Sequence, residues 1–191
     1  MSQPLFIALI VFAAVMAFTP GPNNVMVLSS GLTYGLRRTL PHIAGIAIGV
    51  SFMVAAMGLG LGTIFLAYPV LQTILKYAGI AYLIYLASGI AMSASVAPGQ
   101  DNQRGPMTFW TAALFQWVNV KGWVMAIGII PWNIATQAAL MFVMGGLSSL
   151  VWAAFGSSLR RILTSPKAVR AFNILMALLL LASLYPVFMD A

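Results

Sequence analysis

Residues 5–24 read LFIALIVFAAVMAFTPGPNN, an unbroken apolar run that ends in a Pro-Gly-Pro-Asn-Asn sequence. Apolar residues resume at Val25 and continue to Tyr34, so the block exceeds the roughly 20 residues that a helix needs to cross a bilayer. A transmembrane barrel strand would instead alternate apolar and polar residues. The stretch therefore predicts a membrane-spanning helix with a polar break near its middle.

The composition of the whole chain also indicates a membrane protein. Of 191 residues, 62% are hydrophobic and 6% are charged, with nine Lys or Arg against two Asp or Glu. A soluble domain carries about a quarter charged residues, and a disordered chain is poor in apolar ones, so both classes are excluded. The net charge of +7 is expected to set orientation in the bilayer, and no nucleic-acid partner is predicted. Because the chain has no cysteine, thiolate metal sites are excluded.

Five further apolar blocks follow the first one. We expect six transmembrane helices, over residues 5–34, 40–66, 70–95, 107–130, 134–159 and 171–189. Seven of the nine basic residues fall in three loops on one side, namely Arg37, Arg38, Arg104, Arg160, Arg161, Lys167 and Arg170. The positive-inside rule places these loops in the cytoplasm and both termini outside, in the periplasm.

This arrangement predicts an all-α polytopic membrane protein that forms one transmembrane domain. Residues 1–97 and 98–191 each hold three helices, and the two halves have opposite orientations in the membrane. Each half also has a polar interruption midway along its first helix. Two inverted three-helix repeats are therefore expected, an architecture common among transporters.

The break in the first helix leaves backbone groups without helical partners. Pro20 and Pro22 lack an N–H, so the carbonyls of Met16 and Phe18 have no donor within the helix. In hydrocarbon such groups persist only where protein, water or a ligand satisfies them. The helix expected to restart at Val25 directs free N–H groups at the break; these attract a carboxylate, and the freed carbonyls attract an ammonium. The candidate substrate-binding residues here are Pro20, Gly21, Pro22, Asn23 and Asn24. A packed proline kink is the alternative.

A second interruption lies in the helix expected over residues 107–130, which carries Gln116, Asn119 and Lys121. An ammonium at that depth is costly and normally faces a cavity or a partner. Neither acidic residue, Asp101 or Asp190, falls in an expected span, so a substrate carboxylate is the expected partner of Lys121. The alternative is that Lys121 extends to the cytoplasmic interface.

These motifs resemble a known family. Thr19-Pro20-Gly21-Pro22-Asn23, followed by Gly35-Leu36-Arg37-Arg38, is similar to the signature of the lysine exporter and homoserine/threonine exporter family. Gly79-Ile80-Ala81-Tyr82-Leu83, the length and the six spans are similar too, so the resemblance covers nearly the whole chain. Most family members have Asn-Pro-Lys where this chain has Asn119-Val120-Lys121, so a break in the fourth helix has no proline to cause it.

Within the family, the cysteine/O-acetylserine exporter branch is the most similar in motif. Pro20-Gly21-Pro22-Asn23-Asn24 with Leu28-Ser29-Ser30, and Gln116-x-Val118-Asn119-Val120-Lys121, carry this likeness. The resemblance implies a secondary transporter, without a cofactor, that exports small amino acids or their derivatives across the bacterial inner membrane. A cysteine-like or threonine-like substrate is expected rather than a dibasic one, because no carboxylate in a span is present to hold a second cation.

Other features leave alternatives open. His42 is expected to be an interfacial hydrogen-bonding residue, with a proton carrier as the alternative, and proton antiport and facilitated efflux both remain open. Gly45, Gly49 and Gly60 lie near one helical face, which is typical of close packing inside the protomer or in a homodimer. The alternative function is a non-transporting membrane subunit, in which polar mid-span residues pair and no cavity exists. A membrane-embedded enzyme is not expected, because no acid is available to orient His42 or Lys121, and no metal cluster is visible.

Overall fold

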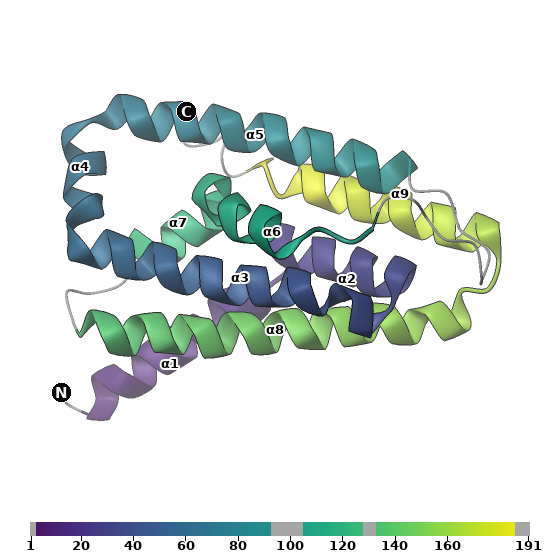
Figure 1. Ribbon diagram of the computed structural model, residues 1–191, viewed down its shortest axis with the longest axis horizontal. Helices are drawn as coiled ribbons and strands as arrows, with labels where there is room; N and C mark the ends of the chain where they lie inside the picture. The colour runs from purple at the N-terminus through teal and green to yellow at the C-terminus, as the bar shows by residue number, and fades with distance from the viewer. Residues whose placement is uncertain (1–2, 93–104, 128–132, 186–191) are drawn as a thin grey trace.

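The computed structural model describes residues 3–92, 105–127 and 133–185, and all regular elements in these ranges are helices (Figure 1). The long helices α3 and α8 pack against each other, as do α5 and α9, and the short helices α6 and α7 lie between these two pairs (Figure 1). Our predictions for Arg104, Asp101 and Asp190 lie outside the described residues. An all-helical fold is confirmed.

The first apolar block forms two helices, α1 (Gln3–Phe18) and α2 (Pro22–Tyr34), whose axes are bent by 51°. The predicted break is therefore confirmed. The prediction that the helix restarts at Val25 was wrong, since α2 begins at Pro22. Proline suits the first helical position because the N–H that it lacks would have no partner there in any helix.

The second apolar block also begins earlier than expected. It consists of α3 (Leu36–Ala56), the π-helical turn η1 (Met57–Leu61) and α4 (Gly62–Ala67). Gly35 has a φ of 80°, a conformation that favours glycine, and it lets α3 start directly after α2. Arg37 and Arg38 consequently lie in the first turn of α3 and not in a loop, and Pro41 lies inside the helix.

The third apolar block forms one continuous helix, α5 (Pro69–Met92), whereas the fourth block is broken. It forms α6 (Phe109–Phe115), the 3-10 turn η2 (Gln116–Val118) and α7 (Val120–Ile127). Asn119 separates η2 from α7 with an extended backbone, φ −82° and ψ 100°. The predicted interruption in this helix is confirmed, and it forms without a proline.

The last two helices are α8 (Ile134–Ile162) and α9 (Pro166–Ala182). Both reach further into the stretch 160–170 than we predicted, so the loop is shorter than expected and covers only residues 163–165. Arg160 and Arg161 lie in the last turn of α8, where their charge is favourable at a helix C-terminus. Lys167 and Arg170 lie in α9.

Six of the nine basic residues lie at one end of the bundle. The end of α2, the start of α3, the end of α8 and the start of α9 all lie there (Figure 1). A Cβ added at Gly35 would lie 3.4 Å from an Nη atom of Arg160, which places the α2–α3 junction beside the end of α8. This clustering is what the positive-inside pattern requires, although the orientation in the membrane stays a prediction.

Glycines bring pairs of helices into close contact. Gly31 of α2 faces the backbone of Ala153 in α8, and Gly156 of α8 faces the backbone of Leu28 in α2, so neither has room for a side chain. Gly45 and Gly49 of α3 similarly face the backbone of α6. Gly45 and Gly49, whose helical face could also have packed against a second copy, thus pack within the protomer. The homodimer stays a prediction.

The described helices have the length and composition of membrane spans. Three are long and apolar enough to cross a bilayer, and the bent pair α1–α2 makes up to four. Large apolar side chains on their outer faces are exposed, such as Leu59 at 78% and Phe52 at 63%, which suits contact with lipid. A polytopic membrane protein is confirmed. Six spans stay a prediction, because α6 and α7 are short and α9 has only 17 residues.

Candidate functional site

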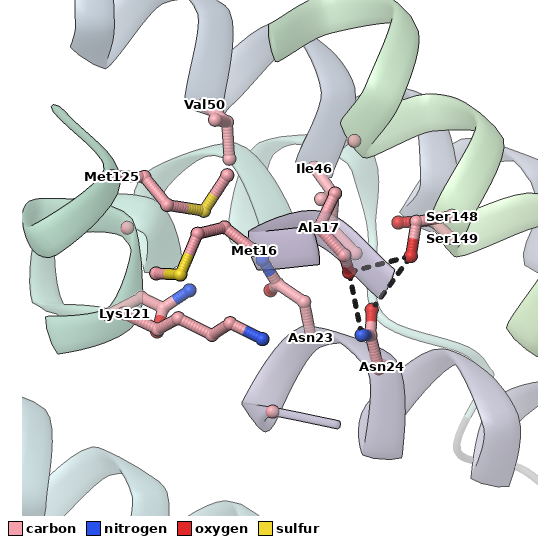
Figure 2. Close-up of a pocket in the computed structure, with 14 residues that line it drawn as sticks. Met16, Ala17, Asn23, Asn24, Ile46, Val50, Lys121, Met125, Ser148 and Ser149 are labelled. Carbon is pink, nitrogen blue, oxygen red and sulfur yellow. Dashed lines mark hydrogen bonds between the residues drawn. The ribbon is translucent and has the colours of Figure 1, made fainter. Parts of the chain in front are cut away.

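The two helix breaks meet at a small cavity in the middle of the protein (Figure 2). Its polar side chains come from α2, from the η2–α7 junction and from α8. They are Asn23, Asn24, Asn119, Lys121, Ser148 and Ser149. The cavity volume is about 30 Å³, which holds water but not an amino acid.

The freed carbonyls at the end of α1 are bonded by side chains of other helices. The amide nitrogen of Asn24 donates to the carbonyl oxygens of Ala17 and Thr19, at 2.9 Å each. The hydroxyl of Ser148 donates to the same Ala17 oxygen at 2.8 Å, and Figure 2 shows these groups converging. Asn24 therefore supplies donors to two carbonyls that have no helical partner at the break between α1 and α2.

The carbonyl of Phe18 is also occupied. It accepts a hydrogen bond of 3.3 Å from the indole nitrogen of Trp152 in α8. The donor that Pro22 removes from its own helix is thus replaced by a side chain of α8. Met16 lines the cavity as predicted for a residue of the break.

The two breaks are joined by a reciprocal pair of amides. Asn23 donates to the side-chain oxygen of Gln116 at 2.8 Å, and Gln116 donates to the side-chain oxygen of Asn23 at 3.2 Å. Gln116 also donates to the carbonyl of Ala112 and is fully buried. Residues 93 positions apart in sequence are thus held together, and the position of one break is tied to that of the other.

Asn119 presents an unpaired acceptor at the cavity. Its amide nitrogen donates to Gln116 at 3.3 Å, but its side-chain oxygen is buried and has no hydrogen-bond partner among the described residues. An unsatisfied buried acceptor costs about 1–3 kcal/mol. A ligand N–H or a water at this position would remove that cost.

Lys121 points into the first break. Its ammonium donates to the carbonyl oxygen of Thr19, and the side chain is partly buried. Gly21 provides the space: a Cβ there would lie 2.7 Å from Cδ and 3.0 Å from Nζ of Lys121. Lys121 has a carbonyl dipole as its partner, and no carboxylate lies within the described residues.

The structure does not bring every candidate residue to this cavity. Pro20 and Pro22 shape the backbone but do not line it, and Gln116 acts through Asn23 and Asn119. His42 lies apart, in a second cavity between α2, α3, α5 and α6. The proton-carrier interpretation of His42 therefore has no direct contact with the predicted site to support it.

Sequence reasoning missed the contribution of α8. Ser148, Ser149 and Trp152 line the cavity or bond to the first break, although no site residue was predicted in their helix. The signal was present as two adjacent hydroxyls within an apolar span. Such polar residues in a membrane helix normally face the interior of the bundle.

The site offers complementary groups for a zwitterion. Lys121, with its ammonium, and Asn119, whose side-chain oxygen is unpaired among the described residues, line one cavity, and the Thr19 carbonyl accepts from that ammonium. The polar residues of the two breaks pair with each other, as the alternative of a non-transporting membrane subunit predicts. A cavity is also present, and that alternative excludes one. No group of three or more potential metal ligands occurs in the described parts of the chain.

Comparison with known proteins gave consistent matches. A family model described as "LysE type translocator" matches residues 14–183. The cysteine/O-acetylserine efflux proteins of Escherichia coli strain K12 and of Shigella sonnei strain Ss046 are each 30% identical, covering 94% of this chain and 95% of the relative. That of E. coli O139:H28 is 29% identical over 95% of this chain and 96% of its own. No solved structure matches the chain.

Proposed function

Because the chain belongs to the LysE type translocator family, we propose that it is a secondary transporter that exports small amino acids or their derivatives from the bacterial cytoplasm. The relatives named as cysteine/O-acetylserine efflux proteins support substrates of that kind, and threonine or homoserine are the second choice. Its place is the inner membrane. The observation that carries the proposal is the ammonium of Lys121 and the bare oxygen of Asn119 at one cavity between two helix breaks.

In this proposal the substrate replaces existing hydrogen bonds. Its carboxylate binds the ammonium of Lys121 and the free N–H groups at the start of α2, which attract anions. Lys121 then leaves the carbonyl of Thr19, and that oxygen becomes free to accept from the substrate ammonium, together with the side-chain oxygen of Asn119. Both charges of the zwitterion are satisfied without any protein carboxylate.

The described arrangement corresponds to a closed state. A cavity of about 30 Å³ must expand before an amino acid enters. The bent junction between α1 and α2 is the proposed hinge, because its backbone is extended at Gly21 and the flexible side chains of Met16 and Met125 line the cavity beside it.

We further infer six spans in two inverted halves, residues 1–97 and 98–191, with both termini in the periplasm. The helix packing supports this symmetry: α3 packs on α8 and α5 on α9, which are the pairs that a two-fold axis between the halves would exchange. The contact of α1 with α8 likewise corresponds to that of α6 with α3. A helix break in the first span of each half is the transporter feature that this architecture places at the substrate.

The test is efflux from proteoliposomes loaded with labelled O-acetylserine, threonine or homoserine. We expect Lys121→Ala to abolish efflux while the protein still inserts, and Lys76→Ala to leave it unchanged, because Lys76 lies on α5 and does not line the cavity. Efflux at the wild-type rate from Lys121→Ala would overturn the assignment. Repeating the wild-type assay with and without a pH gradient separates proton antiport from facilitated efflux, since only the former depends on the gradient.

A further inference from the structure

A second and much larger cavity lies between α2, α3, α5 and α6, toward the end of the bundle where the basic residues gather. Its volume is about 590 Å³, within the roughly 300–1,000 Å³ typical of ligand pockets. The outer cavity is therefore large enough to hold an amino acid.

Polar groups line this cavity from three helices. Ser29 and Thr33 belong to α2, Tyr82 and Tyr85 to α5, and Thr111 to α6. Hydroxyl groups can donate and accept hydrogen bonds, and so can meet either end of a zwitterion. A lipid acyl chain offers them no partner.

His42 supplies the second, independent observation. It lines the cavity, is only 2% exposed, and neither ring nitrogen has a hydrogen-bond partner among the described residues. The nearby hydroxyls of Ser30 and Thr39 bond to each other at 2.9 Å, and Thr39 also donates to the carbonyl of Gly35. A buried imidazole that has no partner within the described ranges points to a polar ligand.

The two cavities are neighbours along α2. Asn24 faces the inner cavity, and Ser29 faces the outer one five residues later. Phe115 is buried between them: its ring lies 5.6 Å from that of Tyr82, and the next residue is Gln116, which bonds to the first break. Phe115 and Gln116 therefore link Tyr82 of the outer cavity to Asn23 of the inner one.

We propose that the outer cavity is a second substrate site, which takes the zwitterionic amino acid on the cytoplasmic side before it reaches the inner cavity. A ring N–H of His42 donates to the substrate carboxylate, and the hydroxyls of α2 and α5 surround the rest. This inference rests on the proposed export function. It assigns His42 to substrate recognition at the entrance and gives the large cavity an occupant.

The chain has no cysteine, so a single thiol reports on the outer cavity. The Ser29→Cys variant places it there, and Ser158→Cys, on an exposed position of α8, is the matched control. The protein in liposomes is treated with a water-soluble maleimide. O-acetylserine is the probe ligand, because it has no thiol that would consume the maleimide. At ten times its half-protecting concentration, O-acetylserine should slow labelling at position 29 roughly tenfold and leave position 158 unchanged.

Two further variants separate this site from the inner one. With Lys121→Ala added, protection at position 29 should persist although efflux is lost. With His42→Ala added, the half-protecting concentration should rise at least about tenfold, whereas His42→Gln, which retains an N–H donor, should restore much of the protection. The thermal unfolding temperature of each variant shows whether it is folded.

Several outcomes overturn the inference. These are no protection at position 29, protection that disappears with Lys121→Ala, or a thiol that reacts only with a membrane-soluble reagent, which would mean that lipid fills the cavity. Efflux without protection would reject the outer site and leave the proposed function standing. Protection at position 29, combined with no efflux by the wild-type protein, would reject the proposed function and leave an amino-acid site at the outer cavity.

Discussion

The substitution Gly21→Ala should displace Lys121 without deleting it. Gly21 has extended backbone, with φ −167° and ψ 179°, which any residue adopts, so alanine adds no backbone strain. The new Cβ would lie 2.7 Å from Cδ and 3.0 Å from Nζ of Lys121. Because both atoms belong to the far part of a flexible side chain, the lysine moves and the helices stay in place.

The size of the effect follows from these distances. Carbon atoms in contact lie about 3.5–4.0 Å apart, so the lysine must withdraw by roughly 1 Å, which is enough to break its hydrogen bond to the Thr19 carbonyl. A hydrogen bond to a charged group contributes about 1.5–3 kcal/mol. If the substrate carboxylate loses the same ammonium, the KM for efflux rises about 10- to 140-fold, at 1.4 kcal/mol per factor of ten.

The assay measures initial efflux rates from proteoliposomes over a range of internal O-acetylserine concentrations. The matched control is Gly145→Ala, because Gly145 lines the same cavity but a Cβ there meets no atom within 4 Å. The thermal unfolding temperature of both variants in detergent should match that of the wild type. We expect a higher KM for Gly21→Ala alone.

Two results would refute this reasoning. Wild-type efflux kinetics for Gly21→Ala would show that the position of Lys121 does not matter to the substrate. Equal losses in Gly21→Ala and Gly145→Ala would show that filling the cavity, and not moving the lysine, impairs transport.

Two further predictions concern the frame around the site. Gly156→Ala should lower the free energy of unfolding by about 1–3 kcal/mol, because its Cβ would lie 2.9 Å from the carbonyl carbon of Leu28. The control is Gly89→Ala, whose Cβ meets no atom within 4 Å and should not destabilise the protein. Equal thermal unfolding temperatures for the two variants would contradict this prediction. For Asn23 and Gln116, a double-mutant cycle of alanine variants should give a coupling energy of about 1–3 kcal/mol in the same measurement, and strictly additive effects would show that the amide pair does not join the breaks.

Much of the fold follows from local chemistry. The Pro-Gly-Pro sequence must interrupt a helix whatever surrounds it, because Pro20 and Pro22 lack the N–H groups that a helix needs. The polytopic class follows from apolar blocks that only a bilayer accommodates. The ends of the helices were less predictable: Arg37 and Lys167 are polar enough to suggest loops, but both belong to helices, since basic side chains can reach water from a helix end.

The sequence by itself determined that polar groups sit in the membrane at two places and that Lys121 has no carboxylate in a span to pair with. Only the tertiary structure decided what these groups contact. It brought Asn23 to Gln116 and Lys121 to Thr19, and it separated His42 into another cavity. The physical reason is that each helix break is caused by the backbone chemistry of a few consecutive residues. The side chains that contact the break come from helices far away in sequence, so the packing of those helices decides which side chains they are. The glycines that let α2 approach α8 decide that packing, and they also bring Ser148 and Trp152 of α8 to the first break.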